Sequence, residues 1–207
     1  MQITSVEKQK NKGRYSVYVD GSYSFSISEE EYFRLNLYEE KEISPEDIEY
    51  IKQNVNFNSA KFAAIKFLSL KIRTTKEVES RLSDNGFDIE TINGVIEELN
   101  SMGYLNDKIY AQKYIYDRSK LKPKSKKLLK SELQSKGIEA WVIDEILDSW
   151  ELDEYSLAEV LIRKKFGKYD LNDEKITKKA YSFLMHRGFS RGLIEQVVRK
   201  VAKGGDY

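Results

Sequence analysis

The sequence predicts a mainly α-helical protein in which three tandem three-helix repeats follow a small N-terminal cap containing a β-hairpin. From residue 57 onward, apolar residues recur at spacings of three and four, which is typical of helices. Three segments of this region superpose with a constant offset of 51 residues. Before residue 57, apolar and polar residues alternate on both sides of an Asp-Gly pair, which indicates two strands. The expected domains are residues 1–56, 57–103, 104–152 and 153–207.

Composition narrows the class of protein. Of the 207 residues, 40% are hydrophobic and 12% aromatic, which argues against disorder. The 35 Lys and Arg nearly cancel the 34 Asp and Glu, although the cap carries a net charge of −4 and the rest +5. Any binding to an acidic partner, such as nucleic acid, must therefore depend on local clusters of basic residues. Cysteine is absent, which excludes disulfides and thiolate metal sites. The charged N-terminus predicts neither a signal peptide nor a membrane span, so a cytoplasmic protein is expected.

The cap is expected to contain a hairpin around Asp20-Gly21. A three-residue connection through Ser22 would pair Val19 with Tyr23 and Val17 with Phe25, and we favour it over a two-residue loop. Three further elements are expected: a strand within residues 2–9, a helix opened by a Ser28–Glu31 capping box and running through Leu35, and a short helix with Pro45 at its first position after Ser44.

A glycine corner recurs in each repeat. The glycine is preceded by a leucine and followed by Phe or Ile, and an apolar stripe comes after it. This pattern predicts two helices joined where a left-handed glycine ends the first, with the next residue packed in the corner. The equivalent residues are Leu82, Leu133 and Leu184; Gly86, Gly137 and Gly188; Phe87, Ile138 and Phe189; Ile92, Ile143 and Ile194; and Leu99, Trp150 and Val201.

A preceding helix repeats with a different offset, 47 residues, so that Ala64, Ala111 and Ala158 correspond. The interval from that alanine to the corner leucine is 18, 22 and then 26 residues, so the first helix or its loop lengthens by 4 each time. Three-helix bundles are expected near residues 58–102, 106–150 and 154–203, stacked into an elongated array. Capping residues support these limits: Thr74 with Glu77, Asp88, Asn106, Asp153 and Ser190.

These motifs resemble the RecX family of bacterial recombination regulators over nearly all of residues 58–203. The residues that carry the resemblance are Arg73-Thr74-x-x-Glu77-Val78-x-x-x-Leu82 before Gly86-Phe87, Gly103-Tyr104-Leu105-Asn106-Asp107, Glu132-Leu133-x-x-Lys136-Gly137-Ile138, and Phe183-Leu184-x-x-Arg187-Gly188-Phe189-Ser190. Ser125 departs from the glycine expected in many relatives, which puts the start of the middle helix of the second repeat in doubt. The cap resembles the extended N-termini of some Gram-positive members.

The resemblance implies a non-enzymatic protein that binds the groove of the RecA recombinase filament, which is protein plus single-stranded DNA. It would modulate strand exchange and co-protease activity, with inhibition expected, and so act in DNA recombination, DNA repair and the SOS response. We also expect a monomer that makes weak direct contact with DNA. We expect no cofactor and no contact with a membrane.

Clustered cations are the candidate contact residues. Residues 118–130 hold seven positive charges and no acid, and Arg163-Lys164-Lys165 form a second cluster. Such density can pair with phosphates or an acidic groove, although charge runs are often only solvated faces. Lys71, Arg118 and Lys165 share one repeat position, which we call the cation ladder. Trp141 aligns with Glu90 and Gly192 and is an anchor candidate or an inter-repeat contact, whereas Trp150 is expected in a core. The candidates are Lys71, Arg73, Arg118, Lys122, Lys124, Lys126, Lys127, Arg163, Lys164, Lys165 and Trp141.

Two other functions remain open. The corners could act as helix-turn-helix elements that bind DNA directly and without sequence preference, because the residues after them share no base-reading set. A solenoid scaffold for an unrelated partner is the second alternative. An enzyme is not expected, since His186 has no partner motif and no phosphate-binding GxxxxGK[ST] loop occurs.

Overall fold

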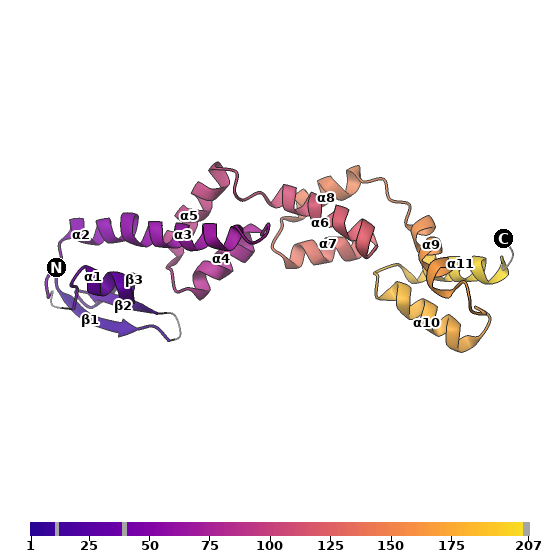
Figure 1. Cartoon of the computed structure of the whole chain (residues 1–207), viewed down its shortest axis with the longest axis horizontal. Helices are drawn as coiled ribbons and strands as arrows, with labels where there is room; N and C mark the ends of the chain where they lie inside the picture. The colour runs from indigo at the N-terminus through magenta and orange to yellow at the C-terminus, as the bar shows by residue number, and fades with distance from the viewer. Residues whose placement is uncertain (11–12, 39–40, 205–207) are drawn as a thin grey trace. The chain divides into compact units, whose positions relative to one another are not determined.

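The structure, a computed structural model, describes residues 1–10, 13–38 and 41–204. The chain forms two compact units, Met1–Asp107 and Lys108–Tyr207. The first unit holds the cap and the first repeat, and the second holds the other two repeats (Figure 1). The predicted fold class is confirmed: a small antiparallel sheet precedes three helical repeats.

The cap begins with a three-stranded antiparallel sheet. Strands β1 (Ile3–Lys8), β2 (Arg14–Val19) and β3 (Ser22–Ser28) lie in the order β1-β2-β3, so the strand predicted within residues 2–9 is confirmed. Side chains that lie on one face of β2 and β3, such as Val17 and Phe25, are fully buried, because successive side chains of a strand point to opposite faces. The sheet therefore presents one apolar face to the core of the cap.

The turn between β2 and β3 is shorter than predicted. Asp20 and Gly21 alone connect the strands, with φ values of 49° and 81°. Two left-handed residues form the type of tight turn whose twist matches that of the strands, which explains the preference for Asp-Gly. The predicted pairing of Val19 with Tyr23 through Ser22 is wrong. The observed pairs are Val17 with Phe25, as predicted, then Tyr18 with Tyr23 and Val19 with Ser22, with a bulge that takes up the extra residue.

Helices α1 (Glu29–Arg34) and α2 (Pro45–Tyr50) begin where the sequence predicts. The hydroxyls of Ser28 and Ser44 accept hydrogen bonds from backbone N–H groups in the first turns of these helices. Helix α2 continues through a π-helical segment, η1 (Ile51–Asn56), into α3 (Phe57–Leu68), so helical backbone crosses the expected domain limit at residue 56. Apolar side chains of η1 and α2 complete the core of the cap.

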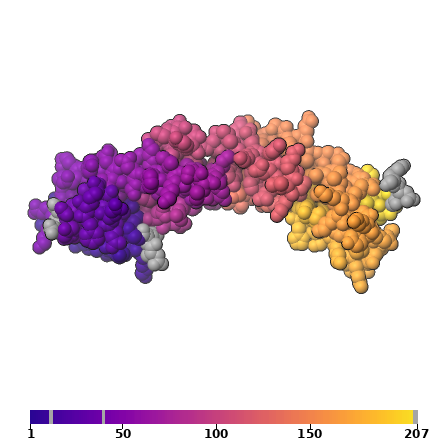
Figure 2. Space-filling view, in the orientation of Figure 1, coloured from indigo at the N-terminus to yellow at the C-terminus, as the bar shows by residue number. Residues whose placement is uncertain are grey.

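A buried arginine joins the cap to the first repeat. Arg14 is 3% exposed, its guanidinium lies 4.1 Å from the centre of the Phe87 ring, and it donates a hydrogen bond to Asn56 Oδ1 at 2.9 Å. Burial lowers the pKa of Arg14 to about 10, so the side chain stays charged at neutral pH. Ser26, which accepts from Arg14, donates its hydroxyl proton to the carbonyl oxygen of Gly86 at 3.1 Å. These contacts place the cap against the corner of the first repeat. In Figure 2, the indigo atoms of the cap lie directly against the purple atoms of this repeat.

Each repeat consists of three helices around its own apolar cluster. In the first repeat, α3 precedes α4 (Thr75–Asp84) and α5 (Ile89–Ser101); in the second, α6 (Asp107–Leu121) precedes α7 (Lys126–Ser135) and α8 (Ala140–Ser149); in the third, α9 (Glu154–Phe166) precedes α10 (Glu174–Met185) and α11 (Arg191–Lys203).

The three predicted corners have the same geometry. All three glycines are left-handed, with φ between 83° and 87°. In every repeat the N–H of the residue after the glycine donates to the carbonyl oxygen of the corner leucine, five residues earlier, as in a Schellman closure. The bonds run from Phe87 to Leu82 at 3.2 Å, from Ile138 to Leu133 at 3.2 Å, and from Phe189 to Leu184 at 3.3 Å, and all three leucines are fully buried.

In each unit, a carboxylate from later in the chain caps the N-terminus of a helix. The N–H of Thr75, the first residue of α4, donates to the carboxylate of Asp107 at 2.9 Å. The N–H of Lys126, the first residue of α7, donates to the carboxylate of Glu154 at 2.7 Å. In both cases the carboxylate lies in the same unit as the helix and satisfies an amide that has no partner within the helix. Ser125 is itself the N-cap of α7, which settles the start of this helix.

The lengthening between repeats has two structural causes. Helix α6 extends 10 residues beyond Ala111, whereas α3 extends 4 beyond Ala64. In the third repeat, the growth lies in the loop after α9 and in α10, which is 12 residues long against 10 for α7. Both alternatives, a longer first helix and a longer loop, therefore occur.

Replacing Gly188 by alanine should destabilise the second unit. Gly188 has φ +83°, and an added Cβ would lie 2.5 Å from Leu128 Cβ and from Ser125 Oγ. Left-handed strain plus this overlap should lower the free energy of unfolding by about 2–4 kcal/mol. The matched change Gly192→Ala places the methyl group in open space on α11 and should change stability by less than ~1 kcal/mol. Urea unfolding of both variants measures the difference, and equal losses would contradict the described corner.

Candidate partner-binding surface

The basic run 118–130 covers the end of α6, a short loop and the start of α7. Arg118 lies over the Tyr114 ring, with its guanidinium 4.8 Å from the ring centre. The neighbouring Tyr114 hydroxyl raises the pKa of Arg118, and that hydroxyl donates to Glu132 at 3.0 Å. Glu132 also forms an ion pair with Lys124, whose side chain is only 17% exposed. These four side chains form one contact network within the second repeat.

Two further lysines of the run hold the second repeat together. Lys126 Nζ donates to the carbonyl oxygen of Leu147 near the end of α8 at 2.7 Å, and Lys130 forms an ion pair with Asp144. A cation at a helix C-terminus and a cross-helix ion pair both stabilise the packing of α7 on α8. Four of the seven cations in this run are therefore engaged by groups inside the repeat, and two of these, Lys124 and Lys130, are paired with carboxylates.

The exposed remainder of the run consists of Lys120, Lys122 and Lys127. The ammonium of Lys120 lies 5.8 Å from the centre of the exposed Tyr116 ring. Lys122 and Lys127 are exposed, and neither forms an ion pair with any residue in the described part of the chain. These two lysines are the charges of the run that an outside partner could neutralise.

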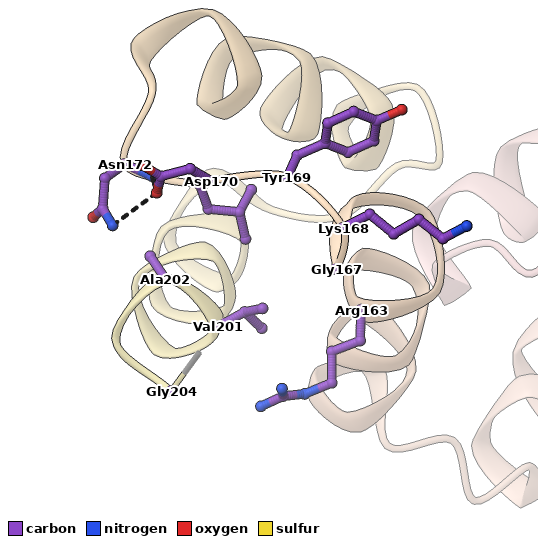
Figure 3. Close-up of a pocket in the computed structure, with 10 residues that line it drawn as sticks. Arg163, Gly167, Lys168, Tyr169, Asp170, Asn172, Val201, Ala202 and Gly204 are labelled. Atoms are coloured by element: carbon purple, nitrogen blue, oxygen red, sulfur yellow. Dashed lines mark hydrogen bonds between the residues drawn. The ribbon is translucent and has the colours of Figure 1, made fainter. Parts of the chain in front are cut away.

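The second basic cluster lies in the last turn of α9. Arg163 pairs with Glu159 at 2.9 Å, and Lys165 lies 4.1 Å from the centre of the Phe183 ring. Lys164 is exposed and makes no ion pair within the described ranges. A cleft of about 560 Å³ borders this turn, and in Figure 3 the Arg163 side chain extends toward the end of α11 while Lys168 points away from that helix.

The other two candidate cations belong to the unit Met1–Asp107. Lys71 lies beyond the end of α3 in a bend and is exposed, whereas Arg118 and Lys165 lie inside helices. Arg73 stacks on Phe67 at 3.9 Å, and its Nε atom is buried without a hydrogen-bond partner in the described residues. The three members of the cation ladder thus differ in local backbone structure, and their role in binding remains a prediction.

The two tryptophans have different environments. Trp141, in the first turn of α8, is 68% exposed. Trp150, at the C-cap of the same helix, is partly buried against the core of the second repeat, as the repeat alignment predicts. Trp141 therefore has the exposure that a partner-binding anchor requires, and its role as one stays a prediction.

The fold and this surface define a helical-repeat protein with a β-rich cap, in which exposed, unpaired lysines lie on the second and third repeats. Among residues 1–10, 13–38 and 41–204, no cluster of His, Asp and Glu could hold a metal ion. In the same ranges no helix has the length and apolar content needed to cross a membrane.

The chain belongs to the RecX family of regulatory proteins. Four family models match it in order: the RecX N-terminal domain at residues 1–44, and the first, second and third three-helix domains at residues 60–99, 106–147 and 152–198. Relatives named Regulatory protein RecX include one from Clostridium beijerinckii, 31% identical over 96% of this chain and 95% of its own length. Another relative, from Clostridioides difficile, is 30% identical over 99% of this chain and 98% of its own length.

Solved RecX structures resemble this one. A crystal structure of regulatory protein RecX matches 95% of this chain and 98% of its own with a TM-score of 0.63 and 26% identity. The RecX structure from Lactobacillus salivarius matches 70% of this chain and 96% of its own with a TM-score of 0.61 and 26% identity. The family resemblance inferred from the corner motifs is thereby confirmed over the whole fold.

Fluorescence distinguishes the two tryptophan environments. The Trp141→Phe variant retains only the partly buried Trp150, so its emission should move to shorter wavelength and acrylamide should quench it less than the wild type. The Trp150→Phe variant should show the reverse, with red-shifted emission and stronger quenching. Identical quenching of the two variants would contradict the described exposure of Trp141.

Proposed function

We propose that this chain regulates the RecA recombinase in the cytoplasm by binding, as a monomer, to the filament that RecA forms on single-stranded DNA. Binding in the filament groove inhibits strand exchange and co-protease activity, without catalysis by the chain itself. The proposal rests on membership of the RecX family together with one observation: exposed lysines without ion-pair partners remain on the second and third repeats. Within the basic run 118–130 and the cluster Arg163-Lys164-Lys165, the exposed lysines that make neither an ion pair nor a ring contact with a described residue are Lys122, Lys127 and Lys164.

These lysines suit an acidic macromolecular surface. Each can neutralise a phosphate or a carboxylate without breaking a contact that the fold needs, in contrast to Lys124 or Lys126. Contacts of this kind release counterions and weaken as salt rises. The exposed Trp141 adds an apolar group in the same unit that could bury surface against a protein partner.

The residues at the corners give little support to the alternative function, direct binding to bare DNA. A helix-turn-helix element reads DNA through residues in the first turn of its second helix. Here those turns carry Ile89-Glu90, Ala140-Trp141 and Arg191-Gly192, among which Arg191 is the only cation. Such turns offer little to phosphates, so we expect the RecA filament to be preferred to the naked strand.

Binding to filament and to bare single-stranded DNA, measured by fluorescence anisotropy across a salt series, tests the proposal. The wild type should bind the filament at least ~10-fold more tightly than the strand. In the Lys122→Glu/Lys127→Glu/Lys164→Glu variant, filament affinity should fall by at least about tenfold, with a shallower salt dependence, because three favourable contacts become repulsive.

The matched control is Lys175→Glu/Lys179→Glu/Lys203→Glu, which changes net charge equally at exposed positions of the same unit. It should keep most of the filament affinity. Equal affinity for the bare strand would favour the DNA-binding alternative. Equal losses in the two variants would show that net charge, and not this surface, controls binding.

A further inference from the structure

A groove within the unit Met1–Asp107 is not used by the proposed function. It has a volume of about 450 Å³ and lies between the start of β2, α3 and the end of α4. It therefore belongs to a different unit from Lys122, Lys127 and Lys164. The lining residues that matter for binding are Phe62, Lys66, Phe67, Leu70, Arg81 and Phe87.

The groove exposes large apolar side chains. Phe62 is 71% exposed and Leu70 is 75% exposed, although both are of types that are usually buried. Phe67 and Phe87, which also line the groove but are less exposed, are already covered by guanidinium groups, those of Arg73 at 3.9 Å and Arg14 at 4.1 Å. These two rings are thus held in place, while the two exposed side chains are available to pack against a partner.

The groove is also cationic. None of its described lining residues is acidic, and Arg14 is committed to the contact between the cap and the first repeat. Lys66 and Arg81 are both exposed, and neither forms an ion pair with another described residue. The groove is therefore positively charged, whereas the cap beside it, residues 1–56, carries a net charge of −4. A ligand with negative charge would be held there by electrostatic complementarity.

We propose that this groove binds an acidic peptide segment of another protein, in which apolar side chains alternate with carboxylates. The apolar side chains pack on Phe62 and Leu70, and the carboxylates pair with Lys66 and Arg81. Such a segment satisfies both features of the groove. Single-stranded nucleic acid fits it less well, because two cations cannot follow a phosphate backbone and, of the two exposed apolar side chains, only Phe62 offers a flat surface for a base.

The probe is a short fluorescein-labelled peptide in which aspartate alternates with phenylalanine and leucine, and its binding to the full chain is measured by fluorescence anisotropy. The wild type should bind it, and should bind a version with lysine in place of aspartate at least ~10-fold more weakly. The double variant Lys66→Glu/Arg81→Glu should lose at least about tenfold in affinity for the acidic peptide, since both complementary charges are reversed.

Phe62→Ser should cause a loss of similar size by removing an apolar contact. Two controls separate these effects from general ones. Ile89→Ser removes an equally exposed apolar side chain, also 71% exposed, on α5 of the same unit. Lys41→Glu/Lys76→Glu makes the same charge change at exposed positions outside the groove. Both control variants should bind the peptide as the wild type does, and circular dichroism melts should show all four variants folded.

Two results would overturn the assignment. The first is equal binding of the acidic and the lysine-substituted peptide, or equal losses in groove and control variants. The second is a single-stranded oligothymidine that binds more tightly than the peptide and loses its affinity in the Lys66→Glu/Arg81→Glu variant, which would make the groove a nucleic-acid site.

Discussion

The left-handed glycine that ends the second helix of each repeat is the constraint on which the rest of the structure depends. At φ near +85° it turns the chain so that the next N–H reaches the carbonyl oxygen of a fully buried leucine. The corner also receives the preceding part of the chain. Ser26 of the cap donates to Gly86, and the N–H of Ser125 in the second repeat donates to the carbonyl oxygen of Arg187 in the third.

The distribution of charge follows from this architecture. Neighbouring helices need cations at their ends and between their faces, so Lys124, Lys126 and Lys130 are held by groups within the second repeat. What remains for a partner is the smaller set of exposed lysines without such contacts. The density of a basic run therefore overstates the surface that it offers, and the proposed regulatory contact rests on the three lysines of the two basic clusters that make no such contact, Lys122, Lys127 and Lys164.

The repeats could be predicted from sequence because their signals are local. A leucine, a glycine and a following apolar residue determine a corner, and Thr74 or Ser190 determines where a helix begins. Interactions between distant segments gave no such signal. Nothing near Arg14 in the sequence indicates that it contacts Phe87, and Phe62 becomes notable only once α3 and α4 enclose a groove. The predicted length of the hairpin loop was wrong because a bulge restores the pairing of Val17 with Phe25, and the alternation of apolar and polar residues gives no sign of this bulge.

Hydrogen–deuterium exchange at single-residue resolution tests most directly whether the three corners are equivalent. The N–H groups of Phe87, Ile138 and Phe189 all donate to buried leucine carbonyls. All three should therefore exchange much more slowly than the amides of exposed loop residues, and at rates that reflect the opening of their repeats. Exchange of any one of the three at the rate of an unstructured peptide would contradict the repeat architecture from which the account is built.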